Sequence, residues 1–253
     1  EYDISAGIRP GILTAAWRKK HYTYLNHYCD HLRSHYDYDK ISLITPNELK
    51  NHLDTDAYCG GSLDDGAGHL HPLRYLLGLS SVATVLGVDI FESSRVVKIA
   101  STESGKLLIH TDRGEIRARS VVIACNGYLD KLQPELSPFI MPINNYVLAT
   151  QTMDQSASNE IIANGVAVAD TKFVVNYFRI SDDNRLLFGG GESYTNKFPS
   201  DIKSFVRSHM LKIFPQVSGM QIDYAWGGKL AITMNRMPLF GRLNNNIYYA
   251  LGY

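Results

Sequence analysis

The sequence has few cysteines and no excess of charge of either sign. Three cysteines, Cys29, Cys59 and Cys125, stand among 253 residues, and Lys+Arg and Asp+Glu are equal at 25 each. An odd number of widely spaced cysteines forms neither a disulfide framework nor a zinc pattern, so we expect a cytoplasmic location. A neutral chain also lacks the basic surplus with which proteins bind nucleic acid or anionic membranes, so we expect neither partner.

Long apolar runs and the common catalytic motifs are absent as well. No apolar run reaches the roughly 18 residues of a membrane helix, and the segment EYDISAGIRPG has no basic or apolar region of a signal peptide. There is no G-x-G-x-x-G, G-x-S-x-G or H-E-x-x-H motif. The chain begins without Met and stops directly after an apolar strand, which we interpret as the sign of an interior fragment.

The first third of the chain reads as mainly helical. Helical spacing of apolar residues predicts one helix over Leu13–Tyr36, on which His27, His31 and His35 lie four apart on one face. That spacing suits a metal site, but no carboxylate or cysteine completes a ligand set, so we favour a solvated face and expect no metal. A capping box at Thr45–Glu48 predicts a short helix that ends near Leu53. A further helix is predicted over Pro72–Leu86, after a loop at 64–68.

A run of short strands follows and ends in a buried one. Alternating residues predict a hairpin around Gly114, which is free to take positive φ, and Ser120–Cys125 is the near-continuous apolar run of a buried parallel strand. Strands of this kind belong to doubly wound nucleotide-binding folds, in which ligands bind at the carboxyl ends of the strands. We therefore expect cofactor contacts at Ala124–Tyr128, with a plain strand-to-helix turn as the alternative.

After Pro142 the residue pattern becomes that of an antiparallel sheet. Strands separated by turn residues predict such a sheet with one covering helix over Asp201–Phe214, and Gly189–Gly191 suits a close backbone approach and not a phosphate loop. A long strand, Ile222–Ile232, then leads through a turn at Asn235–Pro238 to a last strand. The predicted fold class is therefore α/β plus α+β, with an incomplete doubly wound domain and a mostly antiparallel second domain.

Several segments together resemble a known superfamily. The stretches are LDDGAGHLHPLRYLLGL, VVIACNGYLDKLQPEL, DDNRLLFGGGESY, IDYAWGG and NRMPLFGRLNNNIYYALGY. They are similar to the FAD-dependent amine oxidoreductases of the D-amino-acid oxidase and sarcosine oxidase superfamily, and most similar to the gamma-glutamylputrescine oxidoreductase group. The resemblance implies FAD-binding parts at 63–141 and 234–253, and a substrate domain at 1–62 and 142–233.

The resemblance also implies a cofactor site. It implies FAD, held non-covalently because no cysteine falls in the C-terminal region. Val96 matches the strand position at the adenine end of FAD, although a valine in a strand needs no further reason. The matches near the pyrophosphate and ribose are Ala124, Asn126 and Tyr128, and those beside the isoalloxazine are Met237, Pro238 and Gly252.

The substrate side is less defined, and no catalytic residue is assigned. Some relatives bind a substrate carboxylate through Arg, and Arg179 and Arg236 are the arginines placed for it; a salt bridge within the protein explains each equally well. Tyr146 and Trp226 are candidates to wall an aliphatic amine, or simply pack on the sheet. Some relatives activate oxygen with a Lys on the strand that matches RLLFGGG, and this stretch contains no Lys. Lys229 is a candidate for that role on charge alone, and a solvated Lys at the sheet edge is the alternative.

The implied function is oxidation of a small amine, of gamma-glutamylputrescine type, to an imine and then an aldehyde, with electrons passed to oxygen. A different class remains open, namely a non-catalytic remnant or binding module that lacks the FAD pyrophosphate loop. A third possibility is a flavin enzyme that passes electrons to a carrier instead of oxygen.

Overall fold

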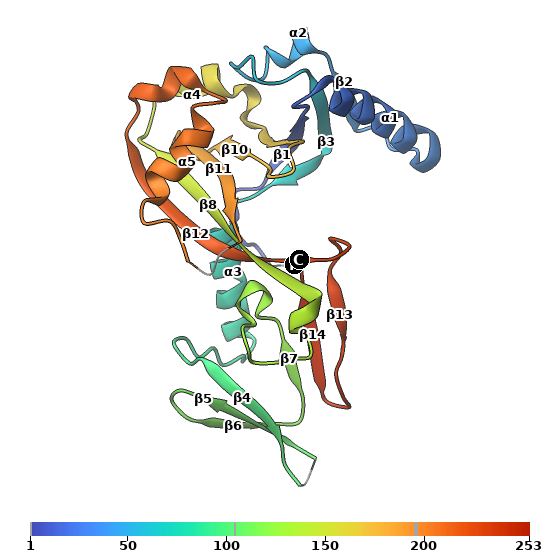
Figure 1. The fold of residues 1–253 in the computed structure, drawn as a ribbon, viewed down its shortest axis with the longest axis vertical. Coiled ribbons are helices and arrows are strands. Elements are labelled where there is room, and N and C mark those ends of the chain that lie inside the picture. The colour runs from blue at the N-terminus through green and yellow to red at the C-terminus, as the bar shows by residue number, and fades with distance from the viewer. Residues whose placement is uncertain (1, 104, 195–196) are drawn as a thin grey trace. The chain divides into compact units, whose positions relative to one another are not determined.

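The computed structural model describes residues 2–103, 105–194 and 197–253 (Figure 1). The chain divides into two compact units, each built from three separate stretches. Unit 1 comprises Glu1–Gly87, Tyr146–Glu192 and Phe198–Gly227, and unit 2 comprises Val88–Asn145, Ser193–Lys197 and Gly228–Tyr253. Strands β8 (Ile140–Thr150) and β12 (Ile222–Thr233) both run across a boundary between units.

A large mixed sheet, mostly antiparallel, forms the framework of unit 1. Its strand order is β12-β8-β11-β10-β9-β1-β3-β2, and β1 pairs in parallel with β9 but antiparallel with β3. The predicted antiparallel sheet is therefore present and is larger than expected. The remaining strands are β1 (Arg9–Ala15), β2 (Ile41–Ile44), β3 (Gly61–His69), β9 (Ala167–Asp170), β10 (Tyr177–Ile180) and β11 (Leu186–Ser193).

The prediction of one helix over Leu13–Tyr36 was wrong at its start. Residues 9–15 form strand β1, and helix α1 runs only from Lys19 to Tyr36. Leu13 and Ala15 are fully buried in the sheet because β1 lies between β3 and β9. Tertiary pairing with strands distant in sequence overrides the local helical spacing here.

The predicted loop at 64–68 was also wrong, because these residues continue strand β3. Asp64 pairs with Ile12 of β1 and with Ile41 of β2, and Gly68 pairs with Pro10. This pairing keeps 63–69 in the large sheet of unit 1, whose first stretch ends at Gly87. The helix α3 (Pro72–Val85) forms as predicted, and none of its residues is buried among the described residues.

The core of unit 1 lies between the sheet and two helices, α4 (Gln155–Ile161) and α5 (Ile202–Met210). Helix α5 packs on β11, because Phe205 and His209 lie beside Gly191 and Gly190, and Figure 1 draws the helix next to this strand. Tyr146 and Phe188 are among the largest fully buried side chains of this core. The glycines of β11 allow the close approach predicted for them, because a Cβ on Gly189 would stand 2.1 Å from the Tyr177 ring.

Two short helical features confirm local sequence signals. Thr45 caps helix α2 (Pro46–Leu49) in a complete capping box with Glu48, at 3.3 Å from the Glu48 N–H to the Thr45 hydroxyl. His71 caps α3 by accepting from the Arg74 N–H at 3.3 Å. On α1, the His31 and His35 rings lie 4.3 Å apart, and within the described part of the chain no three metal-ligating side chains form a site.

Unit 2 contains two three-stranded sheets. The antiparallel sheet has the order β4-β5-β6, and the mixed sheet has the order β13-β14-β7, in which β7 and β14 are parallel. The parallel pairing of β7 matches the prediction, whereas Val122 at its centre is 64% exposed. Gly114 was free to take positive φ in the predicted turn, but it is not among the glycines that do so. The strands are β4 (Val96–Ser101), β5 (Leu107–Thr111), β6 (Glu115–Ala118), β7 (Val121–Ile123), β13 (Leu239–Arg242) and β14 (Ile247–Leu251).

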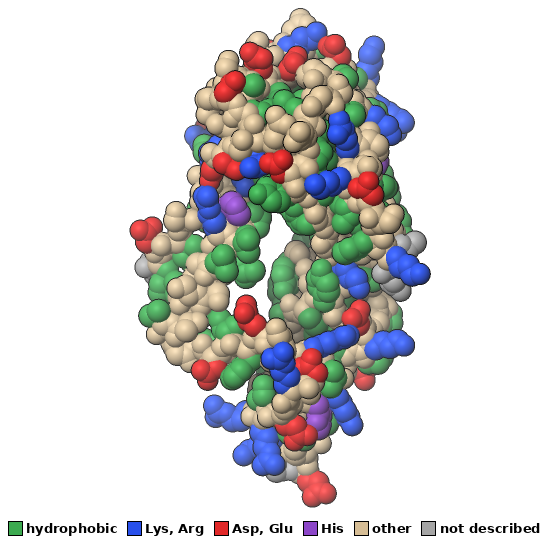
Figure 2. Space-filling view, turned by 90° about the vertical axis from the view of Figure 1, so that its left-hand side faces the viewer, with side chains coloured by type: hydrophobic (Ala, Val, Ile, Leu, Met, Phe, Trp, Pro, Cys, Tyr) green, Lys and Arg blue, Asp and Glu red, His purple; other side chains and the backbone are tan. Residues whose placement is uncertain are grey.

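The surface is mixed in charge, as the neutral composition requires. On the face shown in Figure 2, Lys and Arg side chains are interspersed with Asp and Glu. Among the described residues no helix is both long and apolar enough to span a membrane.

Candidate cofactor site

The turn after strand β7 is fastened to the C-terminal end of the chain. A single 3₁₀ turn, η1 (Asn126–Tyr128), begins with Asn126 in the left-handed region at φ 48°, where Asn is several-fold enriched among residues other than Gly. Its side-chain Oδ1 accepts from the Gly252 N–H at 2.9 Å, and its Nδ2 donates to the Tyr253 carbonyl at 3.2 Å. The Tyr253 hydroxyl in turn donates to the Ala124 carbonyl at 3.1 Å.

The same turn lies against strand β12 within unit 2. A Cβ on Gly127 would stand 2.7 Å from the Lys229 carbonyl oxygen and 2.9 Å from that of Leu230, so only glycine allows this approach. The Lys229 N–H donates to the Tyr128 hydroxyl at 3.2 Å, and the Lys229 ammonium lies 5.7 Å from the centre of the Tyr128 ring. These contacts fix the direction of Tyr128.

The predicted turn at Asn235–Pro238 also lies next to Gly252. The Met237 N–H donates to the Asn235 side chain at 3.0 Å, and the Thr233 hydroxyl donates to the Met237 carbonyl at 2.8 Å. Gly252 has φ 75°, and a Cβ there would stand 2.4 Å from Thr233 Cγ2 and 3.6 Å from the Met237 oxygen. The structure thus brings three predicted positions, Asn126, Met237 and Gly252, into one cluster.

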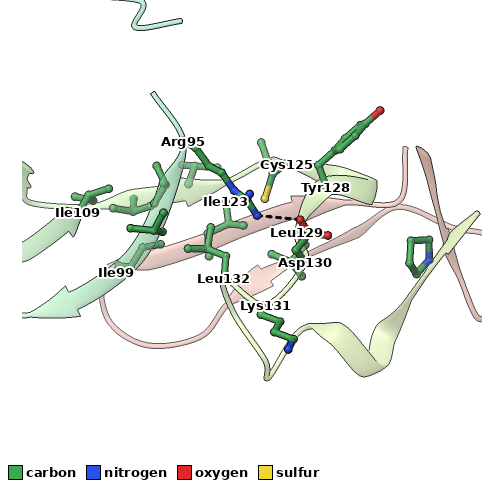
Figure 3. Close-up of a pocket in the computed structure, with 16 residues that line it drawn as sticks. Arg95, Ile99, Ile109, Ile123, Cys125, Tyr128, Leu129, Asp130, Lys131 and Leu132 are labelled. Atoms are coloured by element: carbon green, nitrogen blue, oxygen red, sulfur yellow. Dashed lines mark hydrogen bonds and ion pairs between the residues drawn. The ribbon is translucent and has the colours of Figure 1, made fainter. Parts of the chain in front are cut away.

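A cavity of about 820 Å³ opens at the carboxyl end of β7. Val96, Ala124 and Tyr128, three of the predicted cofactor residues, contribute to its lining. Figure 3 shows Ile99, Ile109, Ile123 and Leu132 gathered at one side of the cavity, with the Tyr128 ring extending away from them. A largely apolar wall with a few polar groups is the usual character of a small-molecule site.

Charged side chains at the rim of this cavity were not found by sequence reasoning. Asp130, at φ 47°, pairs with Arg95 at 3.2 Å and with Lys229 at 3.7 Å, and Figure 3 marks the Arg95 contact. Lys131 also lines the cavity. Lys229 is therefore in an ion pair, and not a solvated lysine at the sheet edge. Burial raises the pKa of the Cys125 thiol, which also lines the cavity, so this thiol is poorly reactive.

The four predicted substrate residues are divided between the two units. Tyr146 is fully buried in the core of unit 1, with Phe198 and Phe205 edge-on at 5.7 and 5.4 Å, so its position matches the packing alternative. Arg179, on β10, contacts the His69 ring nitrogen at 2.8 Å. Trp226 is 47% exposed on β12 of unit 1. Arg236 lies in unit 2, next to Met237, at φ 59°.

Comparison with known proteins gives the chain a family. The model of the family "FAD dependent oxidoreductase" (DAO) matches residues 1–253. Gamma-glutamylputrescine oxidoreductase of Escherichia coli (strain K12) is 35% identical over 253 residues, which are 100% of this chain and 59% of that protein. The probable oxidoreductase OrdL of Haemophilus influenzae is 34% identical over 257 residues, which are 100% of this chain and 58% of that protein.

Solved structures show the same fold. Glycine oxidase from Geobacillus kaustophilus matches with a TM-score of 0.81 and 17% identity, over 98% of this chain and 67% of that chain. L-proline dehydrogenase from P. horikoshii matches with a TM-score of 0.79 and 19% identity, over 99% and 68%. The chain thus spans less than two thirds of the curated relatives named above and has the predicted fold class. It belongs to the DAO family of FAD-dependent oxidoreductases, whose cofactor is FAD.

Proposed function

We propose that the protein oxidises a small amine, of the gamma-glutamylputrescine type, to an imine that hydrolyses to an aldehyde, and passes the electrons to oxygen. The observation that carries the proposal is 35% identity along the whole chain to a gamma-glutamylputrescine oxidoreductase. A second support is that the Asn126 turn, Gly252 and the Met237 turn contact one another, and that a cavity lies at the end of β7, next to the Asn126 turn.

The cavity in unit 2 has the character needed for the nucleotide half of FAD. Apolar strand residues suit the flat adenine ring, and Val96 at the edge of the cavity is proposed to lie at that end. Ala124, Asn126 and Tyr128 would lie near the ribose and pyrophosphate, with Arg95 and Lys131 supplying positive charge at the rim. Unit 2 would then be the FAD-binding domain and unit 1 the substrate domain.

The cluster of Met237, Pro238 and Gly252 is proposed to lie beside the isoalloxazine. Gly252 carries no side chain, which lets Thr233 and the Met237 carbonyl pack close to its backbone and holds the two segments together. The Asn126 amide holds this backbone in place through Gly252 and Tyr253. Such fixed backbone groups need no rearrangement when charge develops on a bound ring.

FAD, when bound, accepts a hydride equivalent from the carbon beside the substrate amine. The chain's part is to orient that carbon and to hold the substrate carboxylate. Of the two candidate arginines, Arg236 directly precedes Met237, a residue of the proposed flavin cluster. Arg236 is therefore proposed to bind the carboxylate of the gamma-glutamyl group as a fork.

Absorbance spectroscopy of the purified protein tests the proposal directly. We expect a flavin band, bleaching of that band by gamma-glutamylputrescine without oxygen, and peroxide when air returns. Arg236→Lys should raise KM for gamma-glutamylputrescine at least tenfold and leave KM for putrescine, which lacks the carboxylate, nearly unchanged. A protein without a flavin band that added FAD does not restore would favour a non-catalytic remnant. Bleaching without peroxide would favour a dehydrogenase with another electron acceptor.

A further inference from the structure

A second cavity, of about 440 Å³, lies in unit 1 and has no part in the proposed reaction. It is formed by the start of β1, by α4, by the turn η3 (Ala163–Gly165) and by the hairpin that joins β10 to β11. Polar side chains predominate in its lining, and four of them are amides. The polar residues are Arg9, Gln155, Asn159, Asn164, Asp182 and Asn184.

Arginines gather around the single carboxylate of this cavity. Asp182 pairs with Arg9 through Oδ1 at 2.7 Å and with Arg74 through Oδ2 at 2.7 Å. Arg179 is close enough to feel both Asp182 and Arg9, and burial is the main cause that lowers its pKa. Two guanidinium groups therefore pair with Asp182, and a third lies within range of its charge.

His69 adds no negative charge and no positive charge at neutral pH. Its Nε2 lies 3.0 Å from the Gly165 carbonyl, and its Nδ1 lies 2.8 Å from Arg179 Nη1. A carbonyl can only accept and a guanidinium can only donate, so Nε2 carries the proton and Nδ1 does not. The ring is thus neutral, and the group of Arg9, Arg74, Arg179 and Asp182 keeps an excess of two positive charges.

The guanidinium nitrogen of Arg9 that does not contact Asp182 lies beside a residue of the cavity wall. Arg9 uses Nη2 for Asp182, while its Nη1 lies 3.5 Å from where a Cβ on Gly165 would stand. Gly165 and the neighbouring Asn164 both line the cavity, and Asn164 adopts φ 62°. Positive charge beside amide groups in a polar hollow is the chemistry that recognises an anion.

We propose that this cavity binds a small monocarboxylate that carries a hydroxyl or ammonium group. Arg9 would bind the carboxylate, and the amide oxygens and Asp182 would accept from the donor group. A multiply charged oxyanion suits the cavity less well, because Asp182 stands in the same lining and repels a second negative charge. The site differs from the flavin cluster in every residue.

Isothermal titration of the FAD-loaded protein tests the site, with L-lactate as the probe. We expect a dissociation constant of about 1 mM or tighter, with the flavin absorbance unchanged. Asn164→Asp places a negative charge at the cavity in a residue type that tolerates left-handed backbone, and it should weaken L-lactate binding roughly tenfold or more. Asn47→Asp makes the same chemical change on exposed helix α2 and should leave the binding unchanged.

Three results would overturn the proposal. One is no heat from L-lactate at 10 mM. Another is equal affinity of wild type and Asn164→Asp. The third is equal binding of neutral lactamide, or of sulfate, because either would remove the carboxylate from the recognition. Arg9→Gln serves as a second variant and should also weaken binding, with a thermal melt to verify that the variant is folded.

Discussion

Asn126 and Gly252 are joined by a 2.9 Å hydrogen bond from the Gly252 N–H to the Asn126 side-chain oxygen, across 126 positions of sequence. The other end of the same amide donates to the next residue, Tyr253. One side chain therefore holds the backbone of two consecutive residues at the proposed flavin cluster.

Asn126→Asp should weaken FAD binding about tenfold, because a carboxylate cannot donate to the Tyr253 carbonyl and repels it instead. The dissociation constant of FAD, followed by flavin fluorescence, measures the effect. Asn246→Asp is the matched control, since the Asn246 Nδ2 donates to the Gly105 carbonyl at 3.0 Å elsewhere in unit 2. Equal losses of FAD affinity in the two variants would contradict a specific role for Asn126.

Gly127→Ala should destabilise the protein by about 1–3 kcal/mol, because the new Cβ would overlap backbone oxygen atoms of β12 that cannot rotate away. Chemical denaturation followed by circular dichroism gives the free energy of unfolding. Gly114→Ala is the control, since a Cβ there meets nothing within 4 Å and Gly114 is not at positive φ. The idea fails if both variants are equally stable.

Asp170→Asn should cost about 3 kcal/mol of unfolding free energy, because the Asp170 carboxylate accepts from several donors in a buried place. The Asn176 side chain donates at 2.8 Å, its N–H at 3.0 Å, and the Tyr58 hydroxyl at 3.2 Å. Burial and the nearby Asp170 charge raise the pKa of Tyr58, which keeps its proton for this bond. Asp56→Asn, at an exposed ion pair with Lys50, should change stability by less than about 0.5 kcal/mol.

Stability should fall as the pH drops below about 6.5, the ordinary pKa of histidine. Burial lowers the pKa of His69 in the folded protein, and the charges of Arg179 and Arg9 act in the same direction, against the Gly165 carbonyl and Asp182. The unfolded chain therefore binds a proton at a pH at which folded His69 does not, and the stability lost levels off below the folded pKa.

His69→Gln removes this proton and should reduce the slope of unfolding free energy against pH between 5 and 6.5. Denaturant titrations at pH 5 to 8 measure it. Above pH 7.5 the difference between wild type and variant should be constant, because the ring is neutral in both states. Identical slopes in the acidic range would exclude the contribution of His69.

Local sequence signals predicted those elements whose stability is mainly local. The capping box at Thr45, helix α3 and the hairpin of β5 and β6 formed as expected. Strand β1 did not, because Leu13 is held by partners about 50 and 155 positions away, Leu63 and Val168, which no local window contains. The strand β13 was missed for the same reason, since its partner is β14.

Some residues of the candidate site were predicted from the sequence, and others were not. Resemblance named Val96, Ala124, Asn126, Tyr128, Met237 and Gly252, and the structure gathers them around one strand end and one turn. Their assignment to parts of FAD stays a prediction. Asp130 and Arg95 were not found, because an ion pair that spans 35 positions leaves no mark in a single sequence.

The interleaving of the two units has a consequence for synthesis on the ribosome. Strand β12 is part of the sheet of unit 1, so that sheet is not complete until residue 227 has left the exit tunnel. The pairing of β1 with β9 must likewise wait while about 150 residues are translated, and at typical elongation rates of roughly 5–20 residues per second this takes many seconds. During that interval the apolar β1 segment lacks its partner, and we expect nascent chains to depend on a chaperone that shields it.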